Sequence, residues 1–109
     1  MMRSLALAAL LAVTAFGPVQ AADPAPISIT IKDRQFVPAE VTVPAGAKVE
    51  LQIRNEQTTA AEFESKSMRR EKVIPPGGSV SLYIGPLNPG RYDFFDDFHP
   101  ATRGIVVVK

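Results

Sequence analysis

A two-residue alternation of apolar and polar side chains runs through most of this chain after residue 26. The segments 27–32, 49–54 and 80–84 each place an apolar side chain at every second position. This is the period of a strand with one buried face, because successive side chains of a strand point to opposite faces. No segment beyond the N-terminal one repeats apolar residues with the 3.6-residue period of a helix. The chain is therefore expected to fold from strands.

Turn-forming residues separate these segments at short intervals. The chain has 10 prolines and 7 glycines, and they gather between the alternating segments, as in Pro75-Pro76-Gly77-Gly78 and Pro89-Gly90. Many short strands with such punctuation are typical of a β-sandwich. The sequence thus predicts an all-β, antiparallel β-sandwich of seven to eight strands. The expected strands cover residues 27–32, 41–43, 49–54, 62–65, 72–74, 80–84, 91–96 and 105–109.

The N-terminal segment has the pattern of a secretory signal. Arg3 precedes an uncharged apolar run that ends at Gly17-Pro18, and small residues reach Ala21. The run is too short for an ordinary membrane span, and the alternative is a short membrane anchor. We expect a signal peptide at 1–21, a flexible leader at 22–26 and one domain at 27–109. Export across a membrane is the implied destination.

Charge and cysteine content exclude several classes of function. The chain has 12 Lys and Arg against 11 Asp and Glu, and loss of Arg3 with the signal would leave equal numbers. No basic stripe of the kind that nucleic-acid binding requires is present. The chain has no cysteine, which excludes a thiolate nucleophile and a blue-copper centre. No nucleic-acid partner is expected.

The residues that can hold a metal ion gather near the C-terminus. Asp96, Asp97 and His99, the single histidine, follow a segment with aromatic side chains at alternate positions. Carboxylate and imidazole are common ligands of transition metals. Asp96 and Asp97 would point to opposite faces if the strand continued through both, so both can bind one ion only if a loop begins at Asp96. The ordinary alternative is that these aspartates end a strand and form a turn.

Further candidate ligands lie in the middle of the chain. Glu62 and Glu64 share one face of the expected strand 62–65, with Phe63 on the other. Glu64 is alternatively a ligand of a second metal ion or a partner in a salt bridge. Met68 follows in a loop, where its thioether is either a soft ligand for copper or part of the packing. Glu62 has a stronger positional argument, which comes from a family resemblance.

The layout resembles a cupredoxin, a Greek-key β-sandwich that holds a metal at one end. Blue-copper members carry a Tyr-x-Phe-x-Cys-x-x-His run before the last loop, and the corresponding run here is residues 92–99. The resemblance places Asp96 where those members have cysteine, and it keeps His99. It places Glu62, which follows the strand ending at Asn55, at the position of the other histidine. The axial methionine expected after His99 is absent.

Three runs resemble one subgroup more closely: residues 61–65, 71–77 and 94–100. They are similar to cupredoxin-like domains of the bacterial ferrous-iron uptake type, as in the cupredoxin domain of EfeO and in FtrB-like periplasmic proteins. This likeness implies a periplasmic protein that binds iron and/or copper and assists Fe(II) oxidation or handover, with ferroxidase-like activity as part of an iron-uptake system. The implied partners are an inner-membrane iron permease and a periplasmic iron-binding protein. The oligomeric state is not indicated.

The candidate ligands give this reading a physical basis. Oxygen ligands with one imidazole suit iron, manganese or Cu(II) better than Cu(I). Two carboxylates stabilise a trivalent ion more than a divalent one, because the Coulomb energy grows with the charge of the ion. A site of Glu62, Asp96 and His99, with Asp97, Glu64 and Met68 as weaker candidates, would therefore favour Fe(III) over Fe(II).

Two other functions are consistent with the same residues. One is a periplasmic copper-binding carrier without redox turnover. The other is a metal-free β-sandwich that acts as an interaction module. Anaerobic mixing with Fe(II) separates the first from iron oxidation, and metal analysis of the native protein tests the second.

Overall fold

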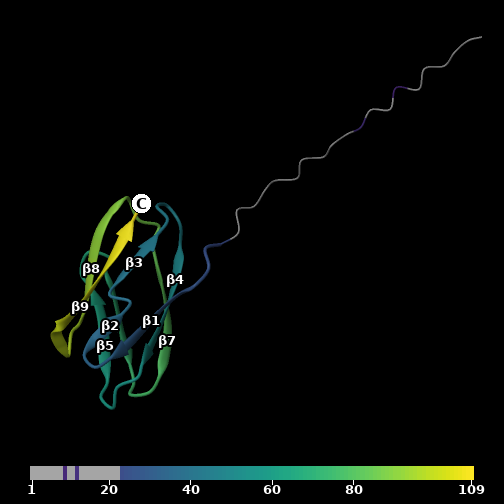
Figure 1. The fold of residues 1–109 in the computed structure, drawn as a ribbon. Helices are drawn as coiled ribbons and strands as arrows, with labels where there is room; N and C mark the ends of the chain where they lie inside the picture. The colour runs from purple at the N-terminus through teal and green to yellow at the C-terminus, as the bar shows by residue number, and fades with distance from the viewer. Residues whose placement is uncertain (1–8, 10–11, 13–22) are drawn as a thin grey trace, which may run out of the picture.

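The computed structural model describes Ala9, Ala12 and residues 23–109, and in this part of the chain it contains nine strands and no helix. The strands follow one another with short connections (Figure 1). Their bounds are β1 Ile27–Lys32, β2 Gln35–Val37, β3 Glu40–Val43, β4 Val49–Asn55, β5 Ala61–Ser65, β6 Arg70–Ile74, β7 Ser79–Ile84, β8 Gly90–Asp96 and β9 His99–Val108.

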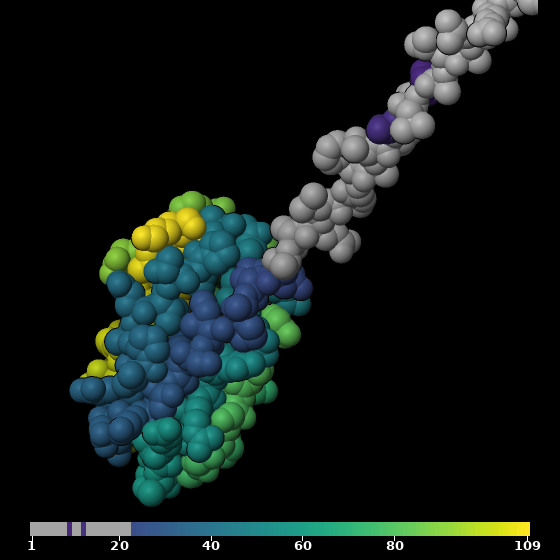
Figure 2. Space-filling model, turned by 45° about the vertical axis from the view of Figure 1, so that its right-hand side comes forward, coloured from purple at the N-terminus to yellow at the C-terminus, as the bar shows by residue number. Residues whose placement is uncertain are grey.

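The strands form two sheets that pack as a sandwich. One sheet has the order β2-β1-β4-β7 and the other has the order β3-β9-β8-β5-β6. Figure 1 shows β8 and β9 on one side of the molecule, opposite β4 and β7. In the space-filling view, β1 runs diagonally as one strand of the first sheet, with β4 and then β7 beside it (Figure 2). The predicted all-β sandwich is confirmed.

The structure differs from the sequence-based expectation in three details. It contains β2, a strand of three residues, which is too short to show a period. Strand β9 begins at His99 and not at residue 105. The pairs β1·β4 and β3·β9 are parallel, whereas the other neighbouring pairs are antiparallel. Side chains alternate in the same way in both kinds of pair, so the pattern of apolar residues cannot distinguish them.

The core lies between the sheets and consists of the inward side chains of the alternating segments. In β4, Val49, Leu51 and Ile53 are buried, as the alternation predicts. Three aromatic rings meet at the centre of the core. The ring of Phe94 lies 4.8 Å from that of Phe36 and 5.0 Å from that of Phe63, centroid to centroid. Since Phe36 comes from the first sheet and the other two rings come from the second, this cluster joins the two layers.

Strand β5 is central to the candidate site because it lies between β6 and β8 in the second sheet. Its residues Ala61, Phe63 and Ser65 are buried, and Glu62 and Glu64 between them are partly exposed. The peptide N–H of Asp97 donates to the carbonyl of Glu62 at 2.9 Å, which ties the turn after β8 to this strand. The fold thus brings the middle of the chain next to the C-terminal acidic run.

Candidate metal centre

The predicted ligands on β5 and at the β8–β9 turn lie in one region of the second sheet. Glu62 and Glu64 come from β5, Asp96 ends β8, Asp97 lies in the turn, and His99 begins β9. Phe63 pairs with Asp96 and Glu64 pairs with Phe95 in the β5·β8 ladder. Residues about 30 positions apart in the sequence are therefore neighbours in the sheet.

Asp96 is fully buried, and hydrogen bonds hold its carboxylate in place. Its Oδ1 accepts the peptide N–H of Glu62 and that of Phe98, each at 3.0 Å. The second of these bonds closes a turn of the Asx type, in which an aspartate side chain accepts the N–H two residues further on. A buried carboxylate is costly unless such donors satisfy it. The two peptide groups thus provide a defined position for this charge.

His99 stands directly beside the same carboxylate. Its Nδ1 lies 3.2 Å from Oδ2 of Asp96, and 31% of its side chain is exposed. The imidazole ring thus contacts the buried carboxylate of Asp96, and part of it is exposed to solvent. A half-exposed imidazole in contact with a carboxylate is able to bind an ion that arrives from solution.

A second group of carboxylates gathers on the partly exposed side of β5. Ligand oxygens of Glu62, Glu64 and Asp97 all lie within 4.8 Å of one another. Asp97 is exposed, whereas Asp96 is buried, so the two aspartates occupy different environments. Strand β8 continues through Asp96, so the loop begins after it, and Asp97 joins the glutamates of β5.

Loss of hydration and electrostatic repulsion both disfavour the charged forms of the two glutamates in this group. The pKa of Glu62 and that of Glu64 are both raised, first by partial loss of hydration and next by the negative charge of Asp97. Glu71 contributes to both shifts. A cation placed among these oxygens would relieve the repulsion.

Glu71 belongs to this environment, and the sequence did not indicate it. It stands directly opposite Glu64 in the β5·β6 ladder. Only the register of the β5·β6 hairpin places Glu71 opposite Glu64. Like charges at opposed positions of a sheet repel each other. Two residues that are seven positions apart become neighbours only once the register is known.

Met68 lies in a different setting from the other candidates. Met68 is 8% exposed and belongs to the core. In the sequence it lies in the connection between β5 and β6. Its peptide N–H donates to Oγ of Ser65 at 3.2 Å, and this hydroxyl donates to the carbonyl of Asp93. The burial of its side chain in the hydrophobic core gives Met68 a packing role. Its role as a ligand stays a prediction.

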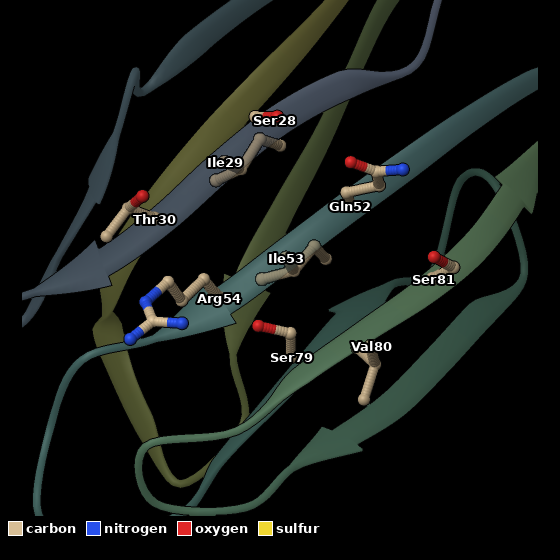
Figure 3. A pocket seen from close by; sticks show the side chains of 9 residues that line it. All are labelled: Ser28, Ile29, Thr30, Gln52, Ile53, Arg54, Ser79, Val80 and Ser81. Atoms are coloured by element: carbon tan, nitrogen blue, oxygen red, sulfur yellow. The ribbon is translucent and has the colours of Figure 1, made fainter.

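The opposite sheet carries a shallow hollow of about 350 Å³ that contains none of the predicted ligands. Figure 3 shows its short polar side chains, which are Ser28 and Thr30 on β1 and Ser79 and Ser81 on β7. Arg54 at its margin is paired with Glu56 at 3.6 Å. The hollow thus has no concentration of titratable groups comparable to that on β5.

The donors at the candidate site fit a transition metal of the harder kind. They are carboxylate oxygens and one imidazole, which suit iron, manganese, zinc or Cu(II). Since the chain has no cysteine, a thiolate-bound copper centre is not available to it. Fold and donors together define a small two-sheet β-sandwich with an oxygen-rich corner that contains one histidine.

Comparison with known proteins places this sandwich in a family. The family model of the Cupredoxin-like domain matches residues 3–108. An uncharacterized protein of Rickettsia prowazekii is 45% identical over 84 residues, which cover 76% of this chain and 67% of that protein. The iron uptake system component EfeO of Yersinia pseudotuberculosis is 35% identical over 107 residues. The chain belongs to the cupredoxin-like domain family.

Solved structures agree with this assignment at the level of the fold. Amicyanin from Paracoccus versutus has a TM-score of 0.62 and 23% identity, over 79% of this chain and 84% of amicyanin. A purple cupredoxin from Nitrosopumilus maritimus has a TM-score of 0.60 and 17% identity, over 76% of this chain and 99% of that protein. The family and its relatives support metal binding as the general function of this domain.

The similarity to EfeO has a limited extent. The matched region is 93% of this chain but 28% of EfeO, so the similarity concerns one part of a longer protein.

The predicted signal peptide at 1–21 lies outside the described residues except for Ala9 and Ala12. In the part of the chain that the structure describes, no helix is long and apolar enough to cross a membrane.

Proposed function

We propose that this chain is a periplasmic cupredoxin-like protein that binds iron and/or copper and assists Fe(II) oxidation or handover for a ferrous-iron transporter. The observation that carries the proposal is the contact between buried Asp96 and half-exposed His99 in a cupredoxin-like domain without cysteine. A second support is the relative whose name identifies it as an iron uptake system component.

The proposed ligands are Asp96, His99 and Glu62. The peptide N–H of Glu62 donates to Oδ1 of Asp96. Glu64 and Asp97 adjoin the carboxylate of Glu62 and add negative charge there. Met68 is the weakest candidate, because it is packed in the core.

The chemistry of this site follows from its charge. Carboxylates stabilise Fe(III) more than Fe(II), since the Coulomb energy grows with the charge of the ion. A site rich in carboxylates therefore lowers the reduction potential of bound iron and favours loss of one electron. Copper or dioxygen would accept that electron. The pKa values of Glu62 and Glu64 are raised first by partial loss of hydration and then by the negative charge of Asp97.

The proposed location and partners follow from the predicted signal peptide and from the relative. Residues 1–21 would direct export and be removed, which would leave the domain in the periplasm. There it would work with an inner-membrane iron permease and a periplasmic iron-binding protein. Detection of the mature form in a periplasmic extract, beginning near Ala22, tests the location.

Titration calorimetry of the metal-free protein tests the site. Asp96→Ala or His99→Ala should weaken metal binding at least tenfold, which corresponds to about 1.4 kcal/mol. Glu50→Gln is a matched control, because Glu50 is a partly exposed glutamate on β4 in the other sheet. Wild-type affinity in both alanine variants would refute the assignment.

Anaerobic mixing with Fe(II) tests the redox function. We expect Fe(III) to form faster with the protein than with the Glu62→Gln and His99→Ala variants, once copper or dioxygen is supplied. Copper binding without faster Fe(III) formation would instead indicate a carrier. Absence of metal binding would indicate an interaction module.

A further inference from the structure

The turn between β1 and β2 holds two consecutive residues in a left-handed backbone conformation. Lys32 pairs with Gln35, so Asp33 and Arg34 alone form the loop of this hairpin. Their φ angles are 50° and 60°, and positive φ at both central residues is the signature of a type I′ turn. Aspartate adopts this conformation more readily than most residues, and glycine adopts it without a steric cost. Arginine has neither advantage, so Arg34 costs the turn free energy.

Two other segments of the chain hold the backbone of Arg34 in this conformation. Its peptide N–H donates to Oε1 of Gln57 at 3.0 Å, and its carbonyl accepts the hydroxyl of Thr102 at 2.8 Å. Gln57 is itself fixed, because its peptide N–H and its side-chain amide both donate to Oδ1 of buried Asn55. Thr102 is buried and belongs to β9. The tertiary structure therefore determines the position of this strained turn.

The same turn borders a hollow of about 390 Å³ at the surface. The loop between β4 and β5 forms its other side. The lining includes Lys32, Asp33 and Arg34 from the turn and Glu56, Thr58 and Thr59 from the loop. The two threonine hydroxyls are able to donate hydrogen bonds to a bound group. None of the predicted metal ligands borders this hollow.

Positive charge predominates in the lining. Neither Lys32 nor Arg34 forms a salt bridge with any residue that the structure describes. Glu56 is paired with Arg54 at 3.6 Å, which leaves Asp33 as the one acid of the lining without a salt bridge among the described residues. A guanidinium presents two parallel N–H groups to a carboxylate or a phosphate, and an ammonium adds a compact second charge. The hollow thus has the donors that an oxyanion requires.

We propose that Arg34 occupies this turn because of its side chain, and that Arg34 and Lys32 together bind a small anion with two carboxylate or phosphate groups. A residue that its surroundings hold in a disfavoured conformation often marks a functional position. The bonds from Gln57 and Thr102 fix the backbone of the turn, and they thus fix the point from which the guanidinium extends to the hollow. The proposal is independent of metal binding at the candidate metal centre.

Titration of the nitrogen-15-labelled, metal-free protein with succinate and with pyrophosphate tests this site. At constant ionic strength, we expect saturable shifts of the amide signals of residues 32–34 and 56–59. The anion that binds more tightly identifies the ligand as a carboxylate or a phosphate compound. Neutral succinamide should cause no such shifts. Absence of saturable shifts at these residues with both anions would overturn the proposal.

Arg34→Gly is the decisive variant, because it removes the cation and relieves the backbone at once. It should weaken anion binding about fivefold, the loss expected for one exposed charge pair. It should also raise the midpoint of urea unfolding, because glycine suits this position of a type I′ turn. Lys32→Gln leaves the turn residues unchanged and should weaken anion binding by a similar factor.

Arg69→Gly is the matched control. Arg69 is another exposed arginine with positive φ, at 55°, in the turn between β5 and β6, and it does not border the hollow. This variant should also gain stability, but it should keep the affinity of the wild type for both anions. Equal weakening in Arg34→Gly and Arg69→Gly would mean that the anions respond to net charge alone, and it would overturn the proposal. A lower unfolding midpoint of Arg34→Gly would also overturn it, because Arg34 would then serve the fold.

Discussion

Three acidic residues on β5 and in the turn after β8 reduce the stability of the folded chain at neutral pH. Glu62, Glu64 and Asp97 bring three carboxylates within 4.8 Å of one another. The pKa of each glutamate is raised, so both bind protons more tightly in the folded chain than in the unfolded chain. A group of this kind favours the fold at low pH, and its contribution is lost as the pH rises through the raised pKa. At neutral pH these charges oppose folding of the metal-free protein.

Glu64→Gln should therefore stabilise the metal-free protein at pH 7. The gain should disappear below pH 4.5, the ordinary pKa of a glutamate, because the wild-type side chain is protonated there. Thermal unfolding across this pH range measures the difference, with Glu50→Gln as the control. A fall in the melting temperature of Glu64→Gln at pH 7 would show that Glu64 supports the fold.

Asn55 is a second residue with a defined structural role. It is fully buried at the end of β4, and its Nδ2 donates to the carbonyls of Thr59 and Ile74 at 2.8 and 3.1 Å. Its Oδ1 accepts the peptide N–H of Gln57. One side chain thus fixes the loop between β4 and β5 against the end of β6.

Asn55→Ala should destabilise the protein by about 1–3 kcal/mol, because it leaves buried peptide groups without partners. Urea unfolding at neutral pH measures this loss. Thr58→Ala is a suitable control, because Thr58 is an exposed residue of the same loop. Equal stability of wild type and Asn55→Ala would mean that water replaces the lost partners.

Strands β8 and β9 show which strand bounds the alternation of apolar residues can predict and which it cannot. The alternation in residues 91–96 predicts β8 closely. Residues 99–103 contain no run of apolar side chains, yet β9 extends back to His99 because its backbone pairs with β8 across an irregularity between Phe95 and Asp96. This irregularity brings His99 opposite Asp96. The sequence predicted the two residues as ligands, but it could not indicate which of their atoms face each other.

The pairing of β8 and β9 also depends on close packing at Gly104. A Cβ atom there would overlap the ring of Phe94, its partner across the two strands, and would lie 2.9 Å from the carbonyl oxygen of Ala39. The backbone of β9 therefore passes directly over the central aromatic cluster. Only a glycine permits this approach.

Gly104→Ala should cost about 1–3 kcal/mol, since overpacking forces the neighbouring groups to move. Gly90→Ala in β8 is the matched control. Its nearest contact would be an ordinary one, 3.5 Å from the ring of Tyr92, so a change within about 0.5 kcal/mol is expected. Chemical denaturation of both variants makes the comparison. Similar losses at the two positions would contradict the packing argument.

For the whole molecule, metal binding and folding should be linked. An ion that binds only the folded state at 100 times its dissociation constant adds about 2.7 kcal/mol of stability. For a domain of this size the melting temperature should rise by roughly 10–20 °C. Calorimetric melting with Zn(II) and then with a chelator measures the rise and its reversal, and Asp96→Asn should show little of it. An equal rise in Asp96→Asn would place the ion elsewhere.

The order of residues alone specifies the class of the fold and the kinds of donor that the chain can offer. Alternation and turn residues specify strands because burial acts on every second side chain, and the absence of cysteine is a fact of composition. The tertiary structure decided the parallel pairings, the place of Glu71 beside Glu64, and the separation of Asp96 from Asp97 into buried and exposed environments. These depend on register and on hydrogen bonds between distant strands, which leave no local trace in the order of residues.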